Sequence, residues 1–175
     1  MIEGIGAGMD YLKYQKKIND VITKAPIETG IEILVYCFLD SNIDETKYTV
    51  ADINRVRKKC DQRLRTDGGI SDLAVLSPDF VFKDEKYGEV YGFIEVKTAG
   101  AILKDTEQTN EQMKKVPHFI YTNGLVWKYY LNCTVQWEII LTTDRATHSF
   151  KNITIDEDQF KKLEKAVGEI NWKKN

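Results

Sequence analysis

Three charged side chains interrupt apolar segments of the chain, and their types suit hydrolytic chemistry. Asp72 stands within Ile-Ser-Asp-Leu-Ala-Val-Leu, and Glu95 and Lys97 stand within Phe-Ile-Glu-Val-Lys. Burial of such groups is costly unless they are paired or bind a metal ion. Two carboxylates and a backbone carbonyl, here that of Val96, are hard oxygen ligands that suit Mg²⁺ or Mn²⁺. With a lysine nearby to position water or stabilise charge, these residues predict metal-dependent hydrolysis of a phosphodiester.

The segments that carry these residues are predicted to be two β-strands, Ile70–Leu76 and Val90–Thr98. Side chains alternate between the faces of a strand, so Glu95 and Lys97 share one face at a separation of roughly 7 Å. If the two strands pair antiparallel, Asp72 reaches Glu95 across them. A solvated sheet face with a simple Glu–Lys ion pair is the structural alternative, and the Asp on the neighbouring strand favours the catalytic interpretation.

The rest of the sequence predicts an α/β fold in which a mixed sheet is flanked by helices. Apolar spacing predicts further strands at 118–122, 125–131 and 135–141, and helices at 9–24, 27–39, 50–64, 103–115 and from Asp156 onward. In the second helix the predicted buried stripe contains Ile27, Ile31, Leu34, Val35 and Phe38. With 175 residues and no evident linker, we expect a single domain over 1–175, with its core at 26–141 and a final helix at 156–170.

The two motif segments together resemble the PD-(D/E)xK, or restriction-endonuclease-like, nuclease superfamily. The resemblance rests on Gly69-Ile70-Ser71-Asp72 followed by the segment from Phe93 to Lys97. Two downstream segments extend the resemblance. The segment from Gln108 to Met113 resembles the glutamine-bearing helix of the family's exonuclease and type I restriction branches. The hairpin in the nuclease domain of type I restriction motor subunits is similar to Phe119 to Gly124 together with Trp127 to Tyr130.

This resemblance implies a three-layer fold and a deoxyribonuclease that uses Mg²⁺ or Mn²⁺. The ion would be bound by Asp72, Glu95 and the backbone of Val96, as the residue types also suggest. Family members often carry a glutamate on the first core helix, for which Glu28 matches best and Glu32 is the alternative. The resemblance also implies that Gln108 orients the active-site lysine or contacts the substrate, unless it is a plain surface glutamine.

The sequence departs from the family pattern at two positions. Ser71 replaces the proline of the eponymous motif, and Gln112 stands where many members have tyrosine. Helicase and P-loop motifs are missing from the sequence, so the chain is not a whole type I motor subunit.

A net charge of −2 argues against nucleic-acid binding by bulk charge, so any DNA contact needs a local basic patch. The predicted helix at 50–64 and the residue after it supply one, with Arg55, Lys58, Lys59, Arg63 and Arg65. A solvated helix face is the alternative explanation of such a charge run. Its place directly before the first motif makes phosphate contact an equal alternative.

The cysteines Cys37, Cys60 and Cys133 are scattered and have no zinc-ligand spacing, which suits a reducing cytoplasm. We expect no signal peptide, no membrane association, and DNA as the partner, with a homodimer or a larger restriction or repair assembly as possibilities. The predicted setting is restriction, defence or repair. Two rival functions are a catalytically inactive module that binds nucleic acid or protein on the same fold, and a structural subunit whose charged residues form only an ion pair.

Overall fold

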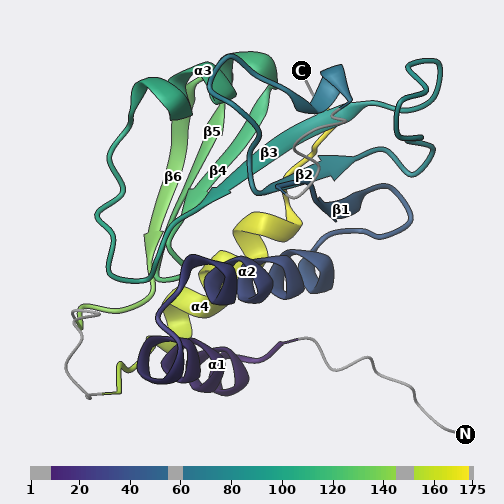
Figure 1. Ribbon diagram of the computed structural model, residues 1–175. Coiled ribbons are helices and arrows are strands. Elements are labelled where there is room, and N and C mark those ends of the chain that lie inside the picture. The colour runs from purple at the N-terminus through teal and green to yellow at the C-terminus, as the bar shows by residue number, and fades with distance from the viewer. Residues whose placement is uncertain (1–8, 55–60, 145–151, 174–175) are drawn as a thin grey trace, which may run out of the picture.

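The computed structural model describes residues 9–54, 61–144 and 152–173 of the chain. In chain order its elements are α1 (Tyr11–Lys24), α2 (Glu28–Asn42), β1 (Thr49–Asp52), a short 3-10 helix (Gln62–Leu64), β2 (Leu73–Leu76), β3 (Val90–Val96), α3 (Glu107–Lys115), β4 (His118–Thr122), β5 (Val126–Leu131), β6 (Thr134–Ile140) and α4 (Glu157–Gly168). Their arrangement is drawn in Figure 1.

The strands form one six-stranded sheet in the order β1-β2-β3-β4-β5-β6. Neighbouring strands are antiparallel except β3 and β4, which are parallel and are joined through α3. A parallel connection needs such a crossover, and a helix is the usual one. In the antiparallel pair of β2 and β3, Leu73 lies opposite Ile94, which brings the preceding Asp72 alongside the following Glu95. The predicted pairing of the two motif strands is therefore confirmed.

Helices cover both faces of the sheet, so the expected three-layer α/β class is confirmed. Helices α1, α2 and α4 pack together on one face, as Figure 1 shows, around a core rich in aromatic side chains. Phe38 lies at its centre, with ring contacts to Tyr14, Trp127 and Phe160 at centroid distances of 5.2–5.7 Å. The opposite face carries a second cluster, in which Met113 of α3 packs with Phe93 and Phe119.

The predicted helix at 50–64 is wrong in its described parts. Thr49–Asp52 is a strand paired residue by residue with β2, and only Gln62–Leu64 is helical, as a 3-10 turn. Val50 is buried in the cluster that packs with α2, and the adjacent Ala51 packs against the cluster on the other face, which is the alternation of a strand.

Helix α1 begins at Tyr11 rather than at residue 9, and the starts of α2 and α3 also differ from the prediction. Ile27 precedes the first turn of α2 and is 58% exposed, whereas the other members of its predicted stripe are buried. Helix α3 begins at Glu107 rather than at residue 103, because the Thr106 and Thr109 side chains form a capping box at that point.

Candidate active site

Asp72 lies just before β2 and is held by the strands on both sides. Its Oδ2 accepts a hydrogen bond of 2.7 Å from the backbone N–H of Val96, and its Oδ1 accepts one of 2.7 Å from the side-chain amide of Asn54. The backbone carbonyl of Asp72 also accepts from the N–H groups of Ile53 and Asn54. The N–H and C=O of a strand residue face the same neighbour, so the carbonyl of Val96 is on the edge of β3 that faces Asp72. Its predicted role as a metal ligand stays a prediction.

Glu95 and Lys97 point to the same side of the sheet, as the alternation of strand residues predicts. Lys97 Nζ lies 2.6 Å from Glu95 Oε1. The carboxylate is buried, and the lysine is partly exposed. Glu95 also accepts hydrogen bonds from α3: Gln108 Nε2 lies 3.4 Å from Oε1, and Gln112 Nε2 lies 3.0 Å from Oε2. The structure therefore brings the predicted Gln108 to the site, together with Gln112, which the sequence analysis did not select.

The position of α3 explains how both glutamines reach Glu95. Gln108 and Gln112 are one turn apart and share a helix face. The turn before β2 packs closely against this helix at Gly68, where a Cβ atom would lie 2.3 Å from the backbone oxygen of Gln108. Only glycine permits this approach, which brings the amino-terminal turn of α3 next to the segment that carries Asp72.

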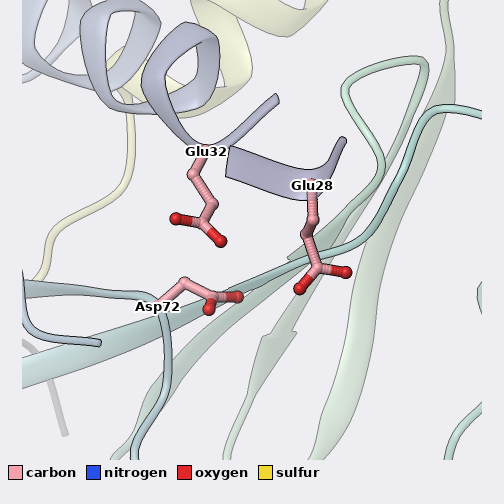
Figure 2. A group of neighbouring side chains, drawn as sticks. All are labelled: Glu28, Glu32 and Asp72. Carbon is pink, nitrogen blue, oxygen red and sulfur yellow. The ribbon is translucent and has the colours of Figure 1, made fainter. Parts of the chain in front are cut away.

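A third carboxylate source is α2, on the other side of the sheet from α3. Figure 2 shows Glu28 and Glu32 projecting from this helix toward Asp72, and one oxygen of each residue lies within 4.8 Å of those of the other two. Glu32 is buried and Glu28 is partly exposed. The sequence left open which glutamate belongs to the site, and the structure places both of them there.

This cluster fits a divalent cation by its chemistry. Oxygen ligands of Mg²⁺ lie at about 2.1 Å from the ion, so ligands on opposite sides of it are about 4.2 Å apart. One oxygen from each of the three carboxylates lies within 4.8 Å of the other two, so small side-chain movements would let them bind a single ion. Asp72 belongs to this cluster and also lies beside Glu95, so it connects the two groups of side chains.

The electrostatics of the site favour a positive ion beside Asp72. Burial, followed by the nearby negative charge of Glu95, raises the pKa of Asp72 to about 7 in the metal-free protein. The hydrogen bond from the N–H of Val96 acts in the opposite direction without cancelling this shift. A carboxylate that is costly to ionise in the absence of a cation gains the most from a bound one.

The pKa of Lys97 is shifted in the direction that keeps its proton. Burial acts to lower this pKa, but the hydrogen bond and charge of Glu95, with the charges of Glu28 and Asp72, outweigh burial and raise it. Lys97 is therefore an ammonium group at neutral pH. It is suited to donate hydrogen bonds and stabilise negative charge, rather than to accept a proton from water.

The predicted DNA-binding residues separate into three groups. Arg55, Lys58 and Lys59 lie outside the described residues. Arg65 is exposed and free to meet solvent. Arg63 forms an ion pair within the protein, with its Nη2 lying 2.7 Å from Oδ2 of buried Asp61.

The surroundings of Arg63 correct its predicted role. Its guanidinium donates two hydrogen bonds to Asp61 and further ones to the backbone oxygens of Val81, Tyr87 and Gly88. It also lies 4.0 Å from the ring centroid of Phe80. A guanidinium has five N–H groups, and these bonds engage all of them, so a phosphate contact would break existing bonds. Arg63 fixes the loop between β2 and β3.

Comparison with known proteins gives a relative in structure and none in sequence. No family model matches the chain, and no curated protein matches it either. Among solved structures, the electron cryomicroscopy structure of a DrdV–DNA complex is similar, with a TM-score of 0.58 at 11% sequence identity. The match covers 92% of this chain but only 14% of that chain, so the whole of this fold corresponds to a small part of a much longer protein. Among the described residues, no helix has the length and apolar character needed to cross a membrane.

Proposed function

We propose that this protein is a metal-dependent nuclease that hydrolyses phosphodiester bonds of DNA. The observation that carries the proposal is the convergence of carboxylates from α2, β3 and the start of β2 with Lys97 at one end of the sheet. Buried carboxylates beside a protonated lysine are costly to fold, and such a cluster is expected where a cation and a phosphate are bound. The DNA substrate is supported by the fold, which is shared with part of a DrdV–DNA complex.

The residues that would hold the ion are Asp72, Glu28 and Glu32, with Glu95 and the carbonyl of Val96 on the side of β3. A divalent ion bound there supplies neutralising charge for the scissile phosphate and lowers the pKa of a coordinated water. Asp72 is oriented for this task by Asn54 and by the N–H of Val96, which fix its two oxygens separately.

Lys97 acts as a cation in this proposal. Its ammonium group is placed by Glu95, and its side chain is partly open to solvent, where a phosphate oxygen can reach it. A fixed positive charge stabilises the negative charge that builds up on the phosphate in the transition state. Arg55, Lys58, Lys59 and the exposed Arg65 are proposed to contact the DNA backbone.

The proposal is tested by incubating the protein with linear, circular and single-stranded DNA in EDTA, Mg²⁺ and Mn²⁺. Lys97→Ala is measured in parallel, with Lys161→Ala as the matched control, because Lys161 makes only an exposed ion pair on α4. We expect cleavage that requires the metal, disappears in Lys97→Ala and persists in the control. Comparison of circular and linear substrates separates endonuclease from exonuclease action.

A failure to cleave is interpreted together with metal binding. Cations that bind the folded state raise its Tm, so thermal unfolding with and without Mn²⁺ reports the metal site independently of DNA. A folded protein that neither cleaves DNA nor gains Tm with Mg²⁺ or Mn²⁺ contradicts the proposal. It then favours a binding module without catalysis.

A further inference from the structure

Gln112 of α3 has an unusual environment for a buried glutamine. The side chain is fully buried, and its Nε2 donates a hydrogen bond of 3.0 Å to Glu95 Oε2. Its Oε1 is also buried, and among the residues that the structure describes it has no hydrogen-bond partner. The amide nitrogen of Gln112 therefore donates to Glu95, whereas its amide oxygen has no donor among the described residues.

The unpartnered oxygen of Gln112 carries a cost in stability. A buried acceptor without a donor loses the hydrogen bonds that water gives it in the unfolded chain, and an apolar side chain of the same size avoids this cost. The next residue of α3, Met113, is an unbranched apolar side chain buried in the adjoining cluster. The retention of a polar group at residue 112 therefore requires a benefit elsewhere, and its only described polar contact is with Glu95.

The hydrogen bonds to Glu95 are divided so that Gln112 controls one oxygen. Oε1 receives both the ammonium group of Lys97 at 2.6 Å and the longer contact from Gln108 at 3.4 Å. Within the described part of the chain, Oε2 receives a hydrogen bond from Gln112 alone. Without this bond the carboxylate is free to rotate about its last side-chain torsion, which has a broad energy profile. Gln108 cannot replace it, because Gln108 is exposed and faces the oxygen that Lys97 already occupies.

We propose that Gln112 is the positioning residue of the site, and that it fixes the Glu95 carboxylate in the orientation that serves metal and Lys97 together. This inference rests on the proposed nuclease function, and the task it assigns to Gln112 differs from that of Gln108, for which the family resemblance implies orientation of the lysine or contact with the substrate. Outer partners of metal-binding carboxylates are known to act in this way, and their loss typically weakens metal affinity or activity about 10- to 100-fold.

The test compares Gln112→Met with Asn110→Met, an equally apolar change at an exposed position of the same helix. Three quantities are measured: Tm in EDTA, the Kd for Mn²⁺ by titration calorimetry, and the rate of DNA cleavage at saturating Mn²⁺. For Gln112→Met we expect a somewhat lower Tm in EDTA, because Glu95 Oε2 is left buried without a donor, and a Kd for Mn²⁺ or a cleavage rate worse by about tenfold or more. Asn110→Met should match the wild type in all three.

A second variant keeps the test decisive if Gln112→Met does not fold. Gln112→Asn keeps the amide but shortens its reach, so it should lose the bond to Glu95 and show the same defect. Wild-type affinity for Mn²⁺ and wild-type cleavage in a folded Gln112 variant would overturn the inference. If the wild type binds Mn²⁺ but cleaves no DNA, the nuclease proposal fails. The Kd of the variants for Mn²⁺ then still tests whether Gln112 positions Glu95 for the metal. A wild type that binds no Mn²⁺ overturns both.

Discussion

Asp72→Asn should stabilise the metal-free protein at alkaline pH, even though it removes a central residue of the site. Burial and neighbouring charge raise the pKa of Asp72 to about 7 in the folded protein, against an ordinary value of 3.8. Each pKa unit corresponds to about 1.4 kcal/mol, so ionised Asp72 opposes folding by up to about 4 kcal/mol at pH 8. A neutral asparagine removes this cost.

The sign of the pH dependence follows from the direction of the shift. Because the pKa of Asp72 is higher in the folded than in the unfolded state, its contribution to stability is complete below about pH 4 and is lost as pH rises through 7. Between pH 5 and pH 8 the metal-free wild type therefore loses up to about 2–3 kcal/mol that Asp72→Asn does not lose.

The net gain is smaller than the electrostatic limit, because an amide offers one acceptor where the carboxylate offers two. Asp72 accepts hydrogen bonds from Val96 and Asn54 through different oxygens, and the substitution weakens one of these bonds at a cost of about 1–2 kcal/mol. We expect Asp72→Asn in EDTA at pH 8 to be more stable by about 1–3 kcal/mol, or roughly 3–9 °C in Tm. At pH 5 the advantage should vanish.

The assay is thermal unfolding in EDTA at pH 5 and pH 8, repeated with Mn²⁺, with Asp158→Asn as a control for loss of an exposed carboxylate on α4. A ligand at 100 times its Kd stabilises by about 2.7 kcal/mol, so Mn²⁺ should reverse the order and make the wild type the more stable protein. If Asp72→Asn is less stable than the wild type in EDTA at pH 8, or if the difference does not change with pH, the electrostatic argument for a cation site is refuted.

Four further substitutions test separate parts of the site. Lys97→Ala should lower the rate of DNA cleavage by about 10²- to 10³-fold and also lower the Tm, because buried Glu95 loses its cation; a retained rate in a cleavage assay would exclude a catalytic role. Arg63→Lys should lower the free energy of unfolding in denaturant by about 2–4 kcal/mol, because an ammonium group cannot replace the five hydrogen bonds of the guanidinium. Arg65→Ala should leave the free energy of unfolding unchanged and reduce the number of ions released on DNA binding, measured from its salt dependence, by about one. Gly68→Ala should cost about 1–3 kcal/mol and reduce cleavage, because the added Cβ meets the backbone of Gln108; unchanged Tm and cleavage would show that this approach is not needed.

Local pattern in the sequence was enough to place Glu95 on its strand and Asp72 and Lys97 directly beside the ends of β2 and β3, one residue outside them. Alternation along β3 predicts that Glu95 and Lys97 share a face, and the structure shows them in contact at 2.6 Å. The capping side chain of Asp156 likewise marks the start of α4, which follows directly after it. These features are decided by neighbours in the chain, since strand alternation and helix caps involve residues only a few positions apart.

The segment before β2 was misjudged because its local pattern is ambiguous. A short run with charges at several spacings fits a helix or a strand, and the pairing of Thr49–Asp52 with β2 decided for a strand. The structural role of Arg63 could not be predicted from the sequence for a related reason. In sequence it is one more basic residue in a charged run, and only the return of the loop at 80–88 shows which acceptors it binds.

The composition of the site beyond its three motif residues was decided by tertiary structure. The sequence favoured Glu28 and left Glu32, one turn on, as the alternative, whereas the approach of α2 to Asp72 brings both to the cluster. In the sequence Gln112 has no feature that separates it from a surface glutamine, and only the packing of α3 against the sheet brings it to Glu95. The sequence alone was enough to select Asp72, Glu95 and Lys97 as site residues at the sheet, because strand alternation and composition are local properties of the chain. The partners and protonation states of these groups depend on burial and charge supplied by segments far along the chain, and those exist only once the layers are packed.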